Sequence, residues 1–249
     1  MSEGLGIALF VGACLLCLGG VVAGGVALTC WGLRARRRHE EALKAAGFEP
    51  VTALAPELAR RLLALSQYDE QTHEAVCRHA RREAGYTILL QGCEARDEVL
   101  AEWQLGPAVH APGLGMPRLT LFPRTVVGER LTRWAIRAVA WRSGGVLRPV
   151  AFPEDPAFES LFEVLGADEA AVRGCLDSNR RAWLAGMRGL TLAGEGDLFT
   201  FERYVQGHPS TTHDDWWFRS VVEDARTLVG ILWVDGIEAG GAPGTEQGP

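Results

Sequence analysis

LTLAGEGDLFTFERY, residues 190–204, is the stretch that most clearly predicts a β-hairpin in this chain of 249 residues. Apolar and polar residues alternate from Leu190 to Leu192 and from Leu198 to Tyr204, which is typical of strands with one buried face. Between them, Gly194-Glu-Gly-Asp197 has the composition of a tight turn. The stretch therefore predicts a strand, a turn and a second, antiparallel strand.

Strands and helices are predicted on both sides of this hairpin. A second hairpin is expected from Ala75 to Arg82 and Tyr86 to Cys93, and further strands at 99–105 and 118–122, separated by a Gly/Pro-rich loop at 106–117. Apolar residues at helical spacing predict helices at 34–46, 55–65, 127–141, 168–185 and 214–232. Because these elements lack a regular βαβ rhythm, the expected fold is a soluble α+β domain with antiparallel hairpins.

The N-terminal segment predicts a transmembrane helix. From Leu5 to Leu33 there is no charged residue, and about 20 apolar residues suffice to cross a bilayer. A cleaved signal peptide and a lipoprotein-like cut before Cys14 are the alternatives, but the segment before the apolar run carries no basic side chain. Gly20 and Gly24 form a GxxxG pair, so the anchor could self-associate.

Basic residues set the expected orientation. Arg34, Arg36, Arg37 and Arg38 follow the apolar run directly. By the positive-inside rule, the chain is expected to be a single-pass inner-membrane protein with its N-terminus outside and its C-terminal domain cytoplasmic. The expected organisation is an anchor at 1–33, an α+β domain at 34–236 with a possible subdivision near 149–156, and a disordered tail at 237–249.

Charge is distributed unevenly along the domain. Residues 34–152 hold 18 Lys/Arg against 13 Asp/Glu, a balance of +5, whereas residues 153–249 hold 7 against 17, a balance of −10. The basic half, with Arg130, Arg133 and Arg137 on one face of a predicted helix, suggests contact with anionic lipid headgroups; a merely solvated face is the alternative. The acidic half argues against nucleic acid as a partner.

One dense group of side chains could bind metal. His208, His213, Asp214 and Asp215 offer nitrogen and oxygen ligands, but their spacing matches no familiar zinc motif, and the two aspartates also suit the start of a helix. Cys77, His79 and Cys93 could share one face of the second hairpin, although buried structural thiols explain the cysteines as well. The sequence thus predicts no metal site and no cofactor.

The C-terminal half resembles a group of uncharacterised bacterial single-pass membrane-anchored proteins of unknown function. The resemblance rests on Phe152-Pro-Glu-Asp-Pro-Ala-Phe158, on Val164-Leu-Gly-Ala-Asp-Glu-Ala-Ala-Val-Arg173 and on the hairpin at 190–204. It implies an anchor, a basic stretch and an α+β domain. Since no activity is known for that group, it implies no chemistry and no site residue.

Function is therefore expected from placement rather than from motifs. The first hypothesis is a membrane-tethered cytoplasmic interaction module, without recognisable catalytic activity, that meets an unknown protein partner through its acidic half or a sheet edge. One alternative is an enzyme of unrecognised type that uses residues 208–215. The other is a peripheral sensor of anionic lipid.

Overall fold

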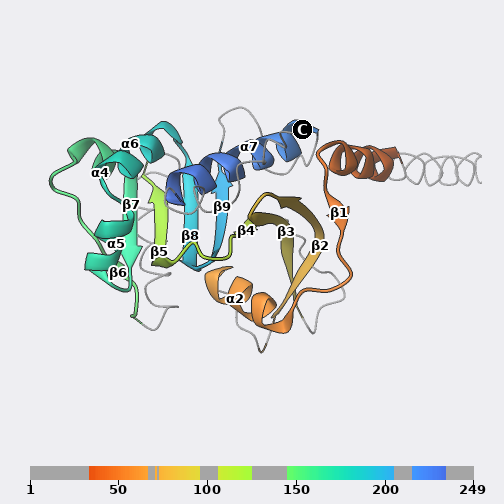
Figure 1. Cartoon of the computed structure of the whole chain (residues 1–249), viewed down its shortest axis with the longest axis horizontal. Coiled ribbons are helices and arrows are strands. Elements are labelled where there is room, and N and C mark those ends of the chain that lie inside the picture. Colours follow the sequence, from red (N-terminus) through yellow and green to blue (C-terminus); the bar gives the residue numbers. More distant parts are fainter. Residues whose placement is uncertain are drawn as a thin grey trace, which may run out of the picture.

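Nine strands form one sheet in the computed structural model, which describes residues 34–66, 71, 73–95, 106–124, 145–204 and 215–233 (Figure 1). All strand pairs are antiparallel, in the order β1-β2-β3-β4-β9-β8-β5-β7-β6. The strands are β1 (Glu49–Pro50), β2 (His73–Glu83), β3 (Tyr86–Ala95), β4 (Gly106–His110), β5 (Met116–Pro123), β6 (Arg148–Pro149), β7 (Phe162–Gly166), β8 (Leu190–Gly196) and β9 (Leu198–Arg203).

Helices cover both faces of this sheet. One helix spans residues 34–45. The others are α2 (Pro56–Ser66), α4 (Pro156–Leu161), α5 (Glu169–Cys175), α6 (Ser178–Gly186) and α7 (Asp215–Leu232). In Figure 1, α7 lies across the middle strands and α2 lies on the opposite side of the sheet.

The hairpin at 190–204 occupies the middle of the sheet, and its prediction is confirmed. β8 and β9 pair with each other through contacts such as Ala193 with Thr200. On one side, Phe199 pairs with Val109 of β4; on the other, Leu192 pairs with Leu121 of β5. The hairpin is thus inserted between two strands that follow each other in the chain, and it joins the two halves of the sheet.

The larger core lies between the sheet and α7. Phe199 and Phe201 of β9 are buried in one cluster with Phe218 and Leu228 of α7. The helix at 34–45 enters the same cluster through buried residues that include Leu43. Fully burying a side chain of this size contributes roughly 1.5–3 kcal/mol, so this face is the main source of stability.

A smaller core fills the space between α2 and the opposite face. Leu62 and Leu63 of α2 pack against Leu89 of β3, Ala108 of β4 and Leu198 of β9. Leu198 and Phe199 are neighbours in the chain, and their side chains enter different clusters because successive residues of a strand point to opposite faces. The alternation in the sequence therefore specifies both cores.

Two local predictions differ from the structure. β4 lies in the segment expected to be a Gly/Pro-rich loop. The single helix expected at 168–185 is two helices, because the carboxylate of Asp177 accepts a hydrogen bond from the Arg180 amide (2.9 Å) and starts α6. The strand expected at 99–105 and the helix expected at 127–141 lie outside the described residues.

The expected membrane-spanning architecture is corrected. Within the parts of the chain that the structure describes, no helix is both long enough and apolar enough to cross a bilayer. This finding contradicts the predicted fold class, with its N-terminal transmembrane helix, and the single-pass location in the inner membrane that depended on it. The predicted span itself, Leu5 to Leu33, lies outside the described residues.

Gly189 gives a test of how the open end of the central hairpin is closed. It has a φ of +79°, and a β-carbon there would lie 2.4 Å from the carbonyl oxygen of Tyr204. We expect Gly189→Ala to lower the free energy of unfolding by at least about 2 kcal/mol, measured by urea denaturation. Gly145 has a φ of +76° with nothing near its absent β-carbon, so Gly145→Ala should cost only about 1 kcal/mol. Equal losses in the two variants would show that the Tyr204 contact is unimportant.

Candidate functional site

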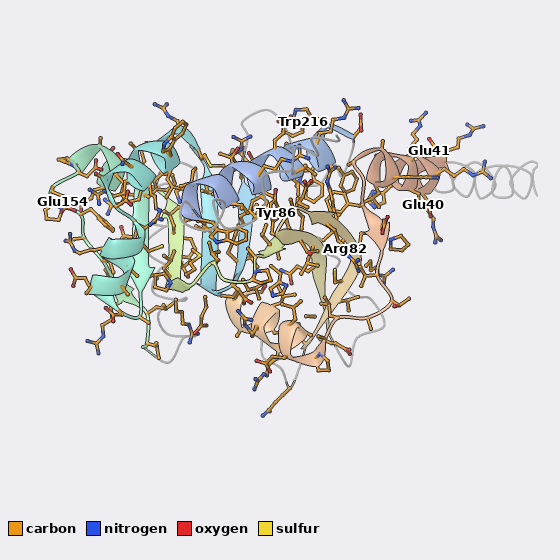
Figure 2. All side chains as sticks on the ribbon, in the orientation of Figure 1. Glu40, Glu41, Arg82, Tyr86, Glu154 and Trp216 are labelled. Atoms are coloured by element: carbon orange, nitrogen blue, oxygen red, sulfur yellow. The ribbon has the colours of Figure 1, made fainter. Side chains whose placement is uncertain are left out.

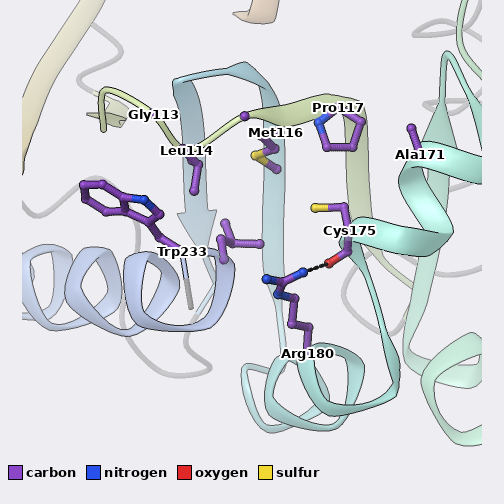
Figure 3. Close-up of a pocket in the computed structure, with 10 residues that line it drawn as sticks. Gly113, Leu114, Met116, Pro117, Ala171, Cys175, Arg180 and Trp233 are labelled. Carbon is purple, nitrogen blue, oxygen red and sulfur yellow. Dashed lines mark hydrogen bonds between the residues drawn. The ribbon is translucent and has the colours of Figure 1, made fainter. Parts of the chain in front are cut away.

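A half-open pocket of about 540 Å³ lies beside the loop between β4 and β5 (Figure 3). Its walls come from the loop and the start of β5 at 113–117, from α5, from Arg180 of α6, and from Leu232 and Trp233 at the end of α7. Its volume falls within the range of about 300–1,000 Å³ that is typical of small-molecule sites. Leu114 and Met116 are among the side chains that line it, but most of its exposed surface is polar.

Arg180 is held rigidly at this pocket by the ends of two helices. Its Nε donates to the carbonyl of Ile231 in α7, and its Nη1 donates to the carbonyl of Cys175 in α5, both at 3.0 Å. Only 16% of the side chain is exposed, and an Asp177 carboxylate oxygen lies 3.6 Å from Nη1. Figure 3 shows Arg180 extending from α6 toward Cys175. The guanidinium is therefore fixed before any ligand arrives.

Trp233 and Cys175 form opposite parts of the pocket wall. The Trp233 ring packs on the β2–β3 turn, where a β-carbon on Gly85 would lie 3.1 Å from it. Cys175 is a free, partly buried thiol, and burial raises its pKa although Arg180 acts to lower it. The thiol is therefore protonated at neutral pH, which makes it a poor nucleophile.

A second hollow, of about 500 Å³, runs along the outer edge of β2. It lies between the segment 52–56, the α2 side chains of Ala59 and Leu63, and β2 residues 74–77. Glu74 and Arg60 are exposed at its rim, whereas Leu63, Ala75 and Cys77 are buried at its base. This hollow, called the edge groove below, combines a strand edge with an apolar floor.

A His–Asp–Arg cluster stands at the turn of the central hairpin. Asp197 lies 2.6 Å from a guanidinium nitrogen of Arg61 in α2 and 3.1 Å from Nε2 of His110 in β4. Burial raises the pKa of Asp197, but Arg61 and His110 together lower it by a larger amount. The net shift of this pKa is therefore downward. The cluster resembles part of a catalytic triad, yet its three groups bind one another and join α2, β4 and the hairpin. Its clearest role is structural.

A buried ion pair fixes α7 to β9. Nε of Arg203 lies 2.9 Å from a carboxylate oxygen of Asp224, whose side chain is 9% exposed. Burial raises the pKa of Asp224 from 3.8 to about 6, although Arg203 acts in the opposite direction. Asp224 thus titrates within a mildly acidic range in the folded protein.

Most of the metal-ligand candidates are not described by the structure. His208, His213 and Asp214 lie outside the described residues. Asp215 begins α7, where it forms an ion pair with Arg219 one turn later. No group of three or more His, Cys, Asp or Glu side chains among the described residues could hold a metal ion.

A β-bulge separates Cys77 from His79. Cys77 pairs with Gln91, but His79 pairs with Leu90, so Arg78 is the extra residue of β2. Cross-strand partners point to the same face, and Gln91 and Leu90 point to opposite faces. Cys77 therefore faces α2 while His79 faces the other side of the sheet, and the predicted common face is wrong.

The basic candidates are only partly described. Arg34, Arg36, Arg37 and Arg38 are exposed on the helix at 34–45, where they share the surface with Glu40 and Glu41 (Figure 2). Arg36 forms an ion pair with Glu40 at 3.1 Å. The remaining candidates, Arg130, Arg133 and Arg137 for a lipid surface and Gly20 and Gly24 for anchor pairing, lie outside the described residues. Contact with anionic lipid, and the absence of nucleic acid as a partner, stay predictions.

The residues of the 540 Å³ pocket have no common signal in the sequence. Arg180, Cys175 and Trp233 come from three helical segments, and only the fold brings them together. The sequence marks one wall, because Gly113 and Gly115 indicate turns, and both indeed have positive φ values, 91° and 65°. Glycine spacing alone could not have shown that this loop borders a pocket.

Comparison with known proteins gives one similar fold. No family model matches the chain, and no curated protein matches it. The crystal structure of the mycobacterial trehalose monomycolate transport factor A, TtfA, is similar with a TM-score of 0.50 at 14% identity, over 80% of this chain and 95% of that one. At this identity the likeness shows the fold alone. The resemblance to uncharacterised anchored proteins stays a prediction.

The Asp224–Arg203 pair predicts a specific pH dependence. Because the folded pKa of Asp224 is raised, its stabilising contribution is complete below pH 3.8 and is lost as the pH rises through about 6. We expect Asp224→Asn to gain about 2 kcal/mol relative to the unmodified chain between pH 4 and pH 7, measured from urea denaturation curves. Glu49→Gln, at an exposed position of β1 that does not act on the pKa of Asp224, is the control and should stay parallel to the unmodified chain. A constant difference between Asp224→Asn and the unmodified chain at every pH would contradict the argument.

Proposed function

We propose that this chain is a non-catalytic interaction module whose partner supplies an extended segment to the edge groove. The observation that carries the proposal is the early departure of β1 from β2. β1 pairs with β2 only at His79 and Ala80, and the Val51 amide donates to the carbonyl of Arg78. After Val51 the chain turns away toward α2, which opens the groove beside residues 74–77.

The backbone of β2 suits this role. Among the described residues, no strand pairs with the outer side of β2 before His79. An edge of this kind offers backbone N–H and C=O groups on alternate residues to an added strand. Strand addition of this type is a common mode of peptide recognition, in which the backbone bonds supply affinity and side-chain pockets supply specificity.

The floor of the groove indicates which side chains would fit. Ala75 and Cys77 point toward α2, where Ala59 and Leu63 lie. An added strand beside residues 74–77 would direct every second side chain to the same face. The small residues on this floor leave room for apolar side chains of moderate size, while Glu74 and Arg60 give the rim both signs of charge.

The other hypotheses receive less support. The name of the structural neighbour, a transport factor, is compatible with a non-catalytic role, and the proposal takes nothing more from it. The proposed enzyme would use residues 208–215, of which only Asp215 is described, and its carboxylate is paired with Arg219. The lipid sensor stays a prediction that rests on Arg130, Arg133 and Arg137.

The proposal can be tested with a displayed library of random peptides. We expect selected peptides to be rich in β-branched residues with apolar side chains at alternate positions, and to slow hydrogen exchange of the backbone amides at 74–77. Ala53 is an exposed residue of the groove wall, so Ala53→Trp should fill the groove and weaken binding at least ten-fold. Ala170→Trp on exposed α5, away from the groove, is the matched control and should bind normally.

Two results would overturn the proposal. Protection from exchange that falls elsewhere in the chain would place the binding surface away from β2. Equal binding by Ala53→Trp and Ala170→Trp would show that the groove is not the contact.

A further inference from the structure

The polar surface of the 540 Å³ pocket has few sources among the side chains that line it. Of the lining residues, Arg180 and Trp233 are the ones whose side chains contain nitrogen or oxygen. The rest of the polar surface must come from backbone groups, such as those of the loop at 113–117, where Gly113 and Gly115 have no side chain to cover them. A ligand for this pocket therefore needs polar atoms of its own rather than an apolar body.

The loop between β4 and β5 keeps its backbone accessible at the two glycines. A β-carbon on Gly113 or on Gly115 would meet no atom within 4 Å. No hydrogen bond joins the amide of either glycine to another residue in the described part of the chain. The loop thus offers N–H groups that an acceptor atom from outside the protein could satisfy.

Arg180 supplies a further donor and the charge. Its Nε and Nη1 are bonded to carbonyls, and among the described residues Nη2 has no acceptor. Figure 3 shows the guanidinium facing the space between Trp233 and Cys175. A guanidinium nitrogen can donate a hydrogen bond but cannot accept one, so the ligand atom at Nη2 must be an acceptor.

The electrostatics of the pocket favour an anion. Arg180 is the charged side chain that lines it, and this side chain is mostly buried, so water screens its charge weakly. Asp177 lies 3.6 Å from Nη1, but 48% of its side chain is exposed, so it offsets the positive charge only in part. Hydrogen bonds between an ionised donor and an ionised acceptor are about twice as strong as those between neutral groups.

We propose that this pocket binds a phosphate group, either free or carried by a small polar molecule. One phosphate oxygen accepts from Nη2 of Arg180, and the others face polar backbone and the open side of the pocket. A phosphate group fills only part of 540 Å³, which leaves room for a polar body attached to it. This site shares no lining residue with the edge groove.

Cys175 provides the readout, because it lines the pocket and its thiol is free. The full chain, in a phosphate-free buffer, is alkylated with iodoacetamide, and the peptide that carries Cys175 is followed by mass spectrometry. We expect glycerol 3-phosphate at saturation to slow this alkylation at least three-fold and glycerol to leave it unchanged. Cys77 is also free and lines the edge groove instead, so its alkylation should not change with either compound.

Inorganic phosphate distinguishes the two sources of the group. Protection of Cys175 at equal concentrations of inorganic phosphate and glycerol 3-phosphate would assign the site to free phosphate. Protection at lower concentrations of glycerol 3-phosphate would assign it to a phosphate monoester. Either result supports the proposal.

Two charge variants test the role of Arg180. Arg180→Gln should remove the protection, whereas Arg188→Gln, at an exposed position outside the pocket, removes the same charge and should keep it. Because Arg180 also fastens two helices, Asp177→Asn is the second variant. Asparagine caps a helix about as well as aspartate, so α6 is preserved while the nearby negative charge is lost. We expect Asp177→Asn to halve, at least, the concentration of glycerol 3-phosphate that gives half-maximal protection.

A plugged pocket separates specific binding from a general effect of the anion. Ala171 lines the pocket and Ala170 does not, although both are exposed on α5. Ala171→Trp should abolish protection of Cys175, and Ala170→Trp should keep it.

Four results would each overturn the proposal. They are equal protection by glycerol and glycerol 3-phosphate, protection that survives in Ala171→Trp, affinity that fails to rise in Asp177→Asn, and no protection of the unmodified chain by either phosphate probe. None of these results bears on the edge groove.

Discussion

Pairing of the central hairpin on both of its sides is the constraint on which the rest of the structure depends. β9 pairs with β4 and β8 pairs with β5, so residues 190–203 unite strands from the N-terminal and middle parts of the chain. The turn is fastened by Asp197, which binds Arg61 of α2 and His110 of β4. The same hairpin supplies Leu198 to one core and Phe199 to the other. A slip of one residue in its register would exchange the two faces and empty both cores at once.

Charged groups in this fold mostly hold elements together, and two of them do so with opposite pH behaviour. Asp197 is shared by Arg61 and His110, which lower its pKa, whereas burial beside Arg203 raises the pKa of Asp224. At the far end of the sheet, the buried Arg181 binds Asp155 at 2.9 Å and lies over the ring of Phe152. Arg180, one residue away, is different, because part of its guanidinium faces a hollow rather than a carboxylate. That contrast separates a structural arginine from a candidate ligand-binding one.

The spacing of apolar residues along the sequence was enough to predict the strands and helices that bury one face and expose the other. The hairpins at 75–93 and 190–204 and the helix α7 follow from alternation, turn residues and helical spacing. The sequence pattern did not predict β4, because Gly106 and Pro107 are typical of loops. This segment is a strand because it pairs with β3 and β9. The edge groove and the pocket could not be foreseen, since each is enclosed by segments that lie far apart in the chain. The bulge at Arg78, which separates Cys77 from His79, likewise leaves no mark in the sequence.

The helix at 34–45 is part of the core rather than a connector. Ala42, Leu43 and Ala46 are buried, and the ring of Phe218 in α7 lies 5.2 Å from His39 and 6.1 Å from Phe48. An expression clone that started at Gly47 would therefore expose the apolar side of α7 to solvent and favour precipitation. The minimal autonomous unit begins upstream of His39. The apolar face of α7 is therefore shared by the sheet and by the segment that enters the domain at residues 34–48.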